Sequence, residues 1–183
     1  MRCVWCDSEY TFSGGENVSL TAVMDQVRQF GCRLVEVTGG EPLAQPQCLD
    51  LIAALCGEDY EVLVETGGYF STENLDPRAK LILDVKCPAS GEVARNHWPN
   101  LERLRADKDE VKFVIADSED WVFTQKVIKE HNLIQRTKAV LISPAWGLID
   151  LKELADLVTS SGLDVRMQLQ LHKYIWGPEA RGV

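Results

Sequence analysis

Short β-rich runs alternate with helical stretches along most of this chain, and this alternation constrains the fold more than any other feature. The β-rich runs contain mainly Val, Ile and Leu, and most are bounded by turn residues; they cover residues 34–38, 61–65, 81–85, 111–115, 139–143 and 165–169. Apolar residues recur three and four positions apart between them, over residues 20–30, 49–56, 122–128 and 151–158. Strands and helices in this order form βαβ units. We therefore predict an α/β fold with a curved parallel sheet and helices outside, as in a partial (β/α) barrel.

The length and composition are those of one globular domain, which we place at residues 1–183. A net charge of −9 would repel a phosphate backbone, so we expect no nucleic-acid partner. The chain shows neither a long apolar run nor a charged-then-apolar leader, so we expect no membrane span and no secretory signal. The six cysteines lack the spacing of a small disulfide scaffold, which favours a reducing cytoplasm.

Polar segments that contain glycine or proline follow four of the predicted strands. They cover residues 38–42, 65–68, 84–88 and 143–147. In a parallel barrel, ligands bind at the carboxyl ends of the strands. One such segment would be an ordinary turn, but four on the same rim predict a site for a polar ligand. Residues 87–104 are the least regular part of the chain, and we expect a long loop or a distorted crossover there.

Two cysteines lie close to the first residue, in the segment Cys3-Val-Trp-Cys6-Asp7. Such a pair could hold zinc, cycle as a dithiol or bind an iron–sulfur cluster. A zinc site would need a second ligand pair at metal spacing, and the other cysteines and the histidines do not offer one. A thioredoxin-like dithiol would follow the first strand instead of preceding it. Cys32, Cys48 and Cys56 are expected to be packing residues.

The segment Gly39-Gly40-Glu41-Pro42 favours the cluster over the other two possibilities. Residues without a Cβ let the backbone approach a ligand closely. Glu41 could form a charge-assisted hydrogen bond near an ammonium group. A Cys-x-x-Cys pair and a Gly-Gly-Glu-Pro turn in this order, separated by one helix, are typical of radical S-adenosylmethionine (SAM) enzymes.

The motifs resemble those of the 7-carboxy-7-deazaguanine synthase family, and the likeness runs from Arg2 to the C-terminus. It is carried by residues 2–12, 37–43, 64–68, 84–91 and 170–177. The resemblance implies a carbon–nitrogen lyase that converts 6-carboxy-5,6,7,8-tetrahydropterin to 7-carboxy-7-deazaguanine with release of ammonia, in 7-deazapurine and queuosine biosynthesis. It also implies a 4Fe-4S cluster, SAM, Mg²⁺, a homodimer, and a reducing partner such as flavodoxin or ferredoxin.

The resemblance also assigns roles to particular residues. Cys3 and Cys6 would bind the cluster, Ser8 would bind Mg²⁺, and Thr38 and Val183 would contact the substrate. The residues implied for SAM are Gly39, Gly40, Glu41, Asp84, Val85, Lys86, Ser143, Pro144, Ala145 and Trp146. His172 lies in the family-like tail, and a role in the site and a role in folding both stay open. No side chain is expected to act as an acid–base catalyst, because the cluster and SAM carry the chemistry.

The chain departs from the family pattern at its start. Relatives carry Cys-x3-Cys-x2-Cys, and this spacing would put the first cysteine two residues before Met1, with the first barrel strand in the same missing segment. A misplaced start, a fragment and an inactive degenerate copy are the three explanations. Another radical SAM enzyme, such as a glycyl-radical activase, is the alternative function. Such an enzyme would not be expected to carry residues 84–88 or the tail at 172–176.

Overall fold

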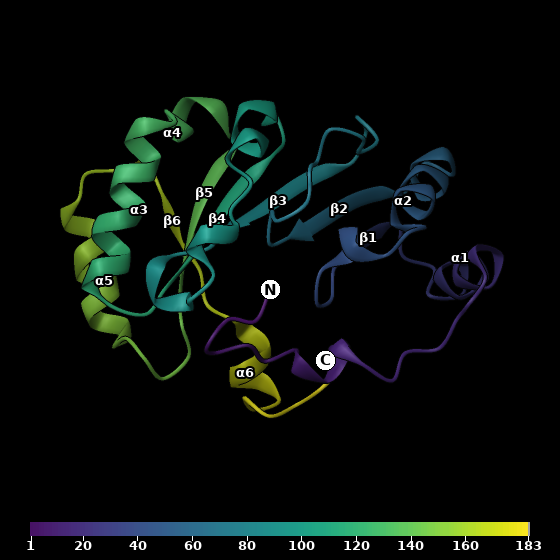
Figure 1. The fold of residues 1–183 in the computed structure, drawn as a ribbon, viewed down its shortest axis with the longest axis horizontal. Helices are drawn as coiled ribbons and strands as arrows, with labels where there is room; N and C mark the ends of the chain where they lie inside the picture. Colours follow the sequence, from purple (N-terminus) through teal and green to yellow (C-terminus); the bar gives the residue numbers. More distant parts are fainter. Residues whose placement is uncertain (183) are drawn as a thin grey trace.

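Six parallel strands form a single curved sheet, as the computed structural model shows for residues 1–182 (Figure 1). The strands are β1 (Leu34–Val37), β2 (Glu61–Thr66), β3 (Lys80–Val85), β4 (Glu110–Ile115), β5 (Ala139–Pro144) and β6 (Arg166–Met167). Each strand pairs with the next in chain order, and β1 and β6 are the edges of an unclosed sheet. This arrangement confirms the predicted partial barrel. The strand expected over residues 165–169 is shorter, since β6 has two residues.

Some of the α-helices begin where the sequence provides a capping side chain. They are α1 (Leu20–Gln29), α2 (Cys48–Gly57), α3 (Ser118–Glu130), α4 (Leu133–Arg136), α5 (Leu151–Ser160) and α6 (Leu171–Ile175). The side chains of Ser19, Asp117 and Asp150 accept hydrogen bonds from backbone N–H groups in the first turns of α1, α3 and α5. The sequence did not predict α4 or α6, because four or five residues are too few to show a helical repeat. No helix within residues 1–182 combines the length and the apolar character needed to cross a bilayer.

Two apolar clusters hold the helices to the outer face of the sheet. The larger contains Phe113 of β4, Ile142 of β5 and Trp121 of α3. The smaller contains Val64 of β2 and Ile52 of α2. In β2, β3 and β4 every second residue is buried, so one face packs under helices and the other faces the hollow of the sheet. The alternation thus leaves the inner face free for polar side chains.

The connection from β3 to β4 contains no α-helix, as the irregular sequence predicted. It consists of three short 3₁₀ turns, Pro88–Ser90, Val93–Arg95 and Trp98–Arg103. The buried carboxylate of Asp120 accepts hydrogen bonds from the backbone N–H groups of Ala89 and Ala116 at 2.9 and 3.0 Å. These bonds hold the first turn against the start of α3. Of the predicted packing cysteines, Cys48 and Cys56 are buried, but Cys32 is exposed, so that prediction is wrong for Cys32.

Candidate active site

A cavity of about 430 Å³ lies at the carboxyl ends of β1 to β4. The opposite wall comes from residues 1–12 and from the tail around α6, which cross the open side of the sheet (Figure 1). The volume of the cavity falls in the range of small-molecule sites. Three of the four polar strand ends named from the sequence line this cavity: residues 38–41, 65–67, and Asp84 with Lys86. The tertiary structure therefore brings them together as the parallel sheet predicted.

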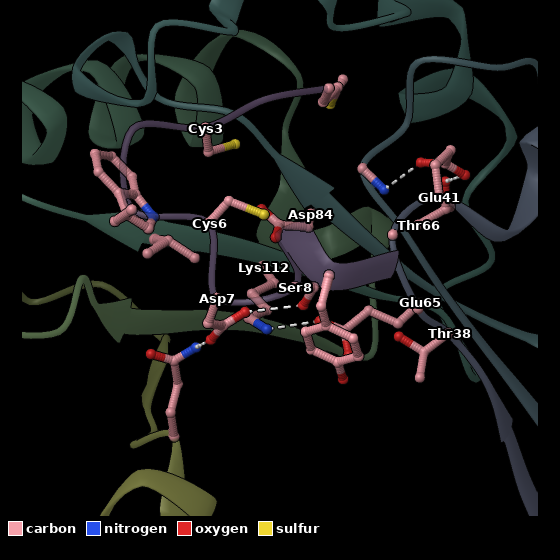
Figure 2. Close-up of a pocket in the computed structure, with 18 of the residues that line it drawn as sticks. Cys3, Cys6, Asp7, Ser8, Thr38, Glu41, Glu65, Thr66, Asp84 and Lys112 are labelled. Atoms are coloured by element: carbon pink, nitrogen blue, oxygen red, sulfur yellow. Dashed lines mark hydrogen bonds and ion pairs between the residues drawn. The ribbon is translucent and has the colours of Figure 1, made fainter. Parts of the chain in front are cut away.

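Cys3 and Cys6 line the cavity, and Figure 2 shows both sulfur atoms directed into it. The backbone N–H of Cys6 donates to the carbonyl of Cys3 at 3.1 Å, which makes a tight turn that keeps the thiols on one side. Burial raises the pKa of the Cys3 thiol, and the charge of Lys86 offsets only part of this rise. Metal binding at Cys3 must therefore displace a proton. Among residues 1–182, no three His, Cys, Asp or Glu side chains are grouped to hold a metal ion. Within this range, no third side chain of these types therefore joins Cys3 and Cys6 as a metal ligand.

A side chain at Gly40 would clash with Thr11. A Cβ on Gly40 would lie 2.7 Å from the Thr11 hydroxyl oxygen, which itself donates to the carbonyl of Ser8 at 2.7 Å. The loop after β1 therefore packs against the 3₁₀ turn Glu9–Phe12, which follows the two cysteines. Gly39 adopts a φ of +133°, which a residue with a side chain rarely adopts. The glycine pair thus serves the close packing of two loops on the cavity wall.

Glu41 joins the ends of two strands. One carboxylate oxygen accepts from the Thr66 hydroxyl at 2.6 Å, and the other accepts from the Gly67 backbone N–H at 3.0 Å. The first oxygen also accepts from the backbone N–H of Leu43 at 3.1 Å. Glu41 is thus a brace for the rim, in addition to facing the cavity. This bracing role was not predicted from the sequence.

Charged side chains of both signs cover the inner face of the sheet (Figure 2). Lys112 of β4 pairs with Glu65 of β2 at 2.6 Å, and its backbone is in register with that of Asp84 on β3. Burial alone would lower the pKa of Lys112, but the charges of Asp84 and Glu65 outweigh this effect and raise it. Burial raises the pKa of Glu36, and the adjacent Glu65 raises it further. Carboxylates outnumber ammonium groups here, which suits a ligand with a positive charge.

Asp84 and Lys86 form a half-buried ion pair at 2.8 Å. Asp84 Oδ1 is buried and has no hydrogen-bond partner among the described residues, so one acceptor remains for a ligand. Val85 lies between them in the chain, but its side chain is packed in the larger apolar cluster on the other face. Only the backbone of Val85 is therefore available for the SAM contact that the resemblance implies.

The predicted segment 143–146 lies beside the main cavity. Pro144, Ala145 and Trp146 line a neighbouring cavity of about 280 Å³. Gln170 lines both cavities, and the Trp146 ring makes an edge-to-face contact with Tyr174 of α6. Ser143 is buried on the inner face, in register with Val114, and its hydroxyl oxygen has no partner within residues 1–182.

The remaining predicted residues are Thr38, Ser8 and Val183. Thr38 and Ser8 line the main cavity, and the Ser8 hydroxyl donates to Asp7 Oδ1 at 3.0 Å. Val183 lies outside the described residues. His172 also lines the cavity, and its Nε2 lies 3.9 Å from Asp7 Oδ2.

Sequence reasoning missed Glu36 and Lys112. Both occupy inner-face positions of their strands, so the signal was a charged residue at alternate positions within a β-rich run. Such a residue is solvent-facing in most sheets. Here residues 1–12 and the tail lie over the open side of the sheet, and only because of this cover does the inner face become a cavity wall.

Most of the donor set fits the groups that a radical SAM enzyme binds. Cys3 and Cys6 supply two of the three thiolates of the family pattern, and thiolates are the soft ligands that an iron–sulfur cluster requires; no third cysteine of the described residues lines the cavity. The free Asp84 Oδ1 and the surplus of carboxylates fit the ammonium and sulfonium charges of SAM. Gly39 and Gly40 present backbone without side chains to the same cavity.

Known proteins are similar to this chain in sequence and in fold. The family model of the Radical SAM superfamily matches residues 1–88. A 7-carboxy-7-deazaguanine synthase of Koribacter versatilis is 40% identical, with 100% of this chain and 87% of the relative covered. A synthase of the same name from Chlorobaculum tepidum is 38% identical, covering 99% and 83%. A third, from Thermoplasma acidophilum, is 32% identical, covering 97% and 83%.

Solved structures support the fold. The crystal structure of QueE from Escherichia coli superposes with a TM-score of 0.70 at 18% identity, covering 92% of this chain and 79% of that one. Streptococcus suis SuiB bound to S-adenosylmethionine superposes with a TM-score of 0.64 at 12% identity, covering 95% of this chain and 49% of SuiB. At these identities the likeness establishes a shared architecture and nothing about the ligands of this chain.

Proposed function

The chain belongs to the 7-carboxy-7-deazaguanine synthase family, and from this membership we propose that it catalyses the reaction for which the family is named. The substrate is 6-carboxy-5,6,7,8-tetrahydropterin, and the products are 7-carboxy-7-deazaguanine and ammonia, within queuosine or another 7-deazapurine pathway. One observation carries the proposal: Cys3 and Cys6 face residues 38–41 and Asp84 across a single cavity. The thiols and the rim segments of this family are thus parts of one site.

The residues of the chain hold and orient the reactants. When bound, the 4Fe-4S cluster and SAM supply the radical chemistry that rearranges the pterin ring. Cys3 and Cys6 would supply thiolates to the cluster, and the free oxygen of Asp84 would accept a hydrogen bond from the SAM ammonium. Thr38 contacts the pterin from the end of β1. The neighbouring cavity lined by Pro144, Ala145 and Trp146 would hold the adenosyl group, and Ser143 precedes these residues at the end of β5.

Lys86 and Glu41 act on the site through the residues that they hold. Lys86 fixes the second oxygen of Asp84 at 2.8 Å, so that Oδ1 stays turned toward the ligand. Glu41 keeps the loops after β1 and β2 at a fixed separation. Enclosure by residues 1–12 and the tail restricts solvent access to the reacting groups.

Mg²⁺ binds through the Ser8 hydroxyl in this proposal. Because that hydroxyl donates its proton to Asp7, its lone pairs remain available to a cation. Ser8→Ala or omission of Mg²⁺ should slow turnover, whereas Ser8→Thr should retain it. Indifference to both Ser8→Ala and the omission of Mg²⁺ in a steady-state assay would remove Mg²⁺ from the proposal.

The cellular setting is also part of the proposal. We expect a cytoplasmic homodimer that receives electrons from a flavodoxin or ferredoxin. Sedimentation of the purified protein tests the homodimer, and turnover supported by each reduced carrier tests the electron donor.

Anaerobic reconstitution with iron and sulfide tests the main proposal. The protein should turn brown and, with SAM, Mg²⁺ and a reductant, convert the carboxypterin to 7-carboxy-7-deazaguanine and ammonia, detected by mass spectrometry. An intact cluster without product would overturn the assignment. Absence of any cluster would instead favour an inactive form of the synthase. A glycyl-radical activase would cleave SAM without consuming the pterin.

A further inference from the structure

Helix α6 packs against the rest of the protein through a charged side chain and not through an apolar one. Lys173 is the one buried residue of this helix, with 6% of its surface exposed. The apolar residues Leu171 and Ile175 are 63% and 62% exposed. Burial of an ammonium group costs several kcal/mol unless a partner compensates it. The docking of α6 therefore depends on what Lys173 contacts.

The partner of Lys173 is Asp7, the residue directly after Cys6. Lys173 Nζ lies 2.9 Å from Asp7 Oδ2, and the Asp7 side chain remains 36% exposed. Gln170 Nε2 donates to the same carboxylate at 3.5 Å, and His172 Nε2 lies 3.9 Å away. The tail thus directs three nitrogen-bearing side chains at one carboxylate of the cysteine loop, defined here as residues 3–8.

Through its position, Asp7 restrains Cys6 and Ser8, its two neighbours in the chain. Its other oxygen, Oδ1, accepts from the Ser8 hydroxyl at 3.0 Å, so the direction of that hydroxyl depends on the position of the carboxylate. Cys6 precedes Asp7, and its backbone is tied to Cys3 by the turn at 3.1 Å. Beyond α6, the Arg181 guanidinium stacks over the Tyr10 ring at 5.3 Å, which is a second contact between the tail and the N-terminal segment.

We propose that Lys173 is a positioning residue, which holds the cysteine loop in its cavity-facing conformation through its ion pair with Asp7. It touches neither substrate nor cofactor in this role. The significance of the loop rests on the function proposed above, but the mechanical coupling between α6 and the loop does not.

The coupling makes a local prediction. In Lys173→Met the side chain keeps its length and loses its charge, and the half-exposed Asp7 carboxylate is free to turn to solvent. We expect the loop and the tail to loosen while the sheet stays intact, because separate segments of a fold open independently. Hydrogen exchange of the cluster-free protein, followed by mass spectrometry, should be about tenfold faster in residues 1–12 and 168–182 and unchanged in β4.

Matched variants separate this role from general effects of charge. Lys152→Met removes an exposed lysine of α5 that pairs with Asp156 at 2.7 Å, and it should leave both segments unchanged. Asp7→Asn should reproduce the faster exchange of Lys173→Met, and the double variant should add little to either. Lys173→Arg should restore most of the protection. Unchanged exchange in residues 1–12, or an equal increase throughout the sheet, would overturn the proposal.

A second measurement links the coupling to the cysteines. After anaerobic reconstitution with limiting iron, Lys173→Met should retain less than about half of the iron of the wild type, and Lys152→Met should retain all of it. Equal iron content in Lys173→Met and wild type would count against the positioning role. Failure of the wild type itself to bind iron would contradict the proposed function instead, so the two failures are distinguishable.

Discussion

The Glu41 carboxylate accepts a hydrogen bond from the Thr66 hydroxyl at 2.6 Å and so ties the end of β1 to the end of β2. The Thr66 hydroxyl oxygen in turn accepts from the backbone N–H of Gly68 at 3.1 Å. Thr66 is almost fully buried, at 1% exposed. Glu41, the glutamate of the Gly-Gly-Glu-Pro turn, therefore uses much of its acceptor capacity in hydrogen bonds with the rim itself.

Removal of the Thr66 hydroxyl should loosen this rim. A hydrogen bond to a charged group contributes about 1.5–3 kcal/mol, so Thr66→Val should lower the free energy of unfolding by a similar amount and weaken SAM binding. Thr159→Val is the control, because the Thr159 hydroxyl is exposed and bonds within its own helix at 2.8 Å. Urea denaturation and SAM titration measure the two effects. Equal losses in both variants would contradict the bracing role of Glu41.

Loss of either cavity thiol should abolish iron binding. Cys3→Ala and Cys6→Ala should each lose the cluster and the activity together, because each removes one of two paired thiolates. Cys32→Ala should retain both, since Cys32 is exposed and does not line the cavity. Iron and sulfide content and the visible absorbance spectrum provide the measurement. Retention of a full cluster in Cys3→Ala would refute the assignment.

A methyl group at Gly40 should push two loops apart. Its carbon would lie 2.7 Å from Thr11 Oγ1, so Gly40→Ala must either turn the Thr11 hydroxyl away from the Ser8 carbonyl, with loss of that hydrogen bond, or displace the 3₁₀ turn that follows the cysteine loop. Overpacking of this kind costs about 1–3 kcal/mol. Gly57→Ala in α2 is the opposite case: its Cβ would meet nothing within 4 Å, and it should stabilise the fold by about 0.4–1 kcal/mol. Thermal unfolding of both variants tests this difference in sign.

The inner-face carboxyl of Glu36 should make stability depend on pH. Burial and the charge of Glu65 raise its pKa above the ordinary 4.5, so the folded protein holds this proton more tightly than the unfolded chain. Glu36 therefore penalises folding progressively as pH rises from about 4.5 through its raised pKa. Glu36→Gln should increase the Tm at pH 7.5 and change it little at pH 4.

Glu61 provides a control of opposite sign for this pH dependence. Its hydrogen bond with Lys80 lowers the pKa of Glu61, so its ionised form favours the folded state above the ordinary value and this contribution is lost as pH falls. Glu61→Gln should therefore lower the Tm at pH 7.5. An identical pH profile for both variants would contradict the raised pKa of Glu36.

Much of the architecture could be predicted because its signals are local. The β-rich runs around Val64, Phe113 and Ile142 and the amphipathic helices between them satisfy short-range periodicity, which a single sequence displays. The rim segments also follow from local order, since the carboxyl ends of parallel strands must share one edge. The short helices α4 and α6 and the two-residue length of β6 could not be predicted in this way, because these elements contain too few residues to display a periodic pattern.

The order of the residues alone is enough to predict the fold class, the edge of the sheet that carries the site, and the cysteine and glycine motifs on that edge. Which groups meet there depends on the three-dimensional arrangement of the chain. Gln170 and Asp7 are 163 residues apart, and the contact of Lys173 with the same carboxylate follows from the tail crossing the open side of the sheet. Likewise Glu41 became a brace because Thr66 and Gly67 end the neighbouring strand. Ion pairs and hydrogen bonds act over a few ångströms in space, and a sequence records only separation along the chain.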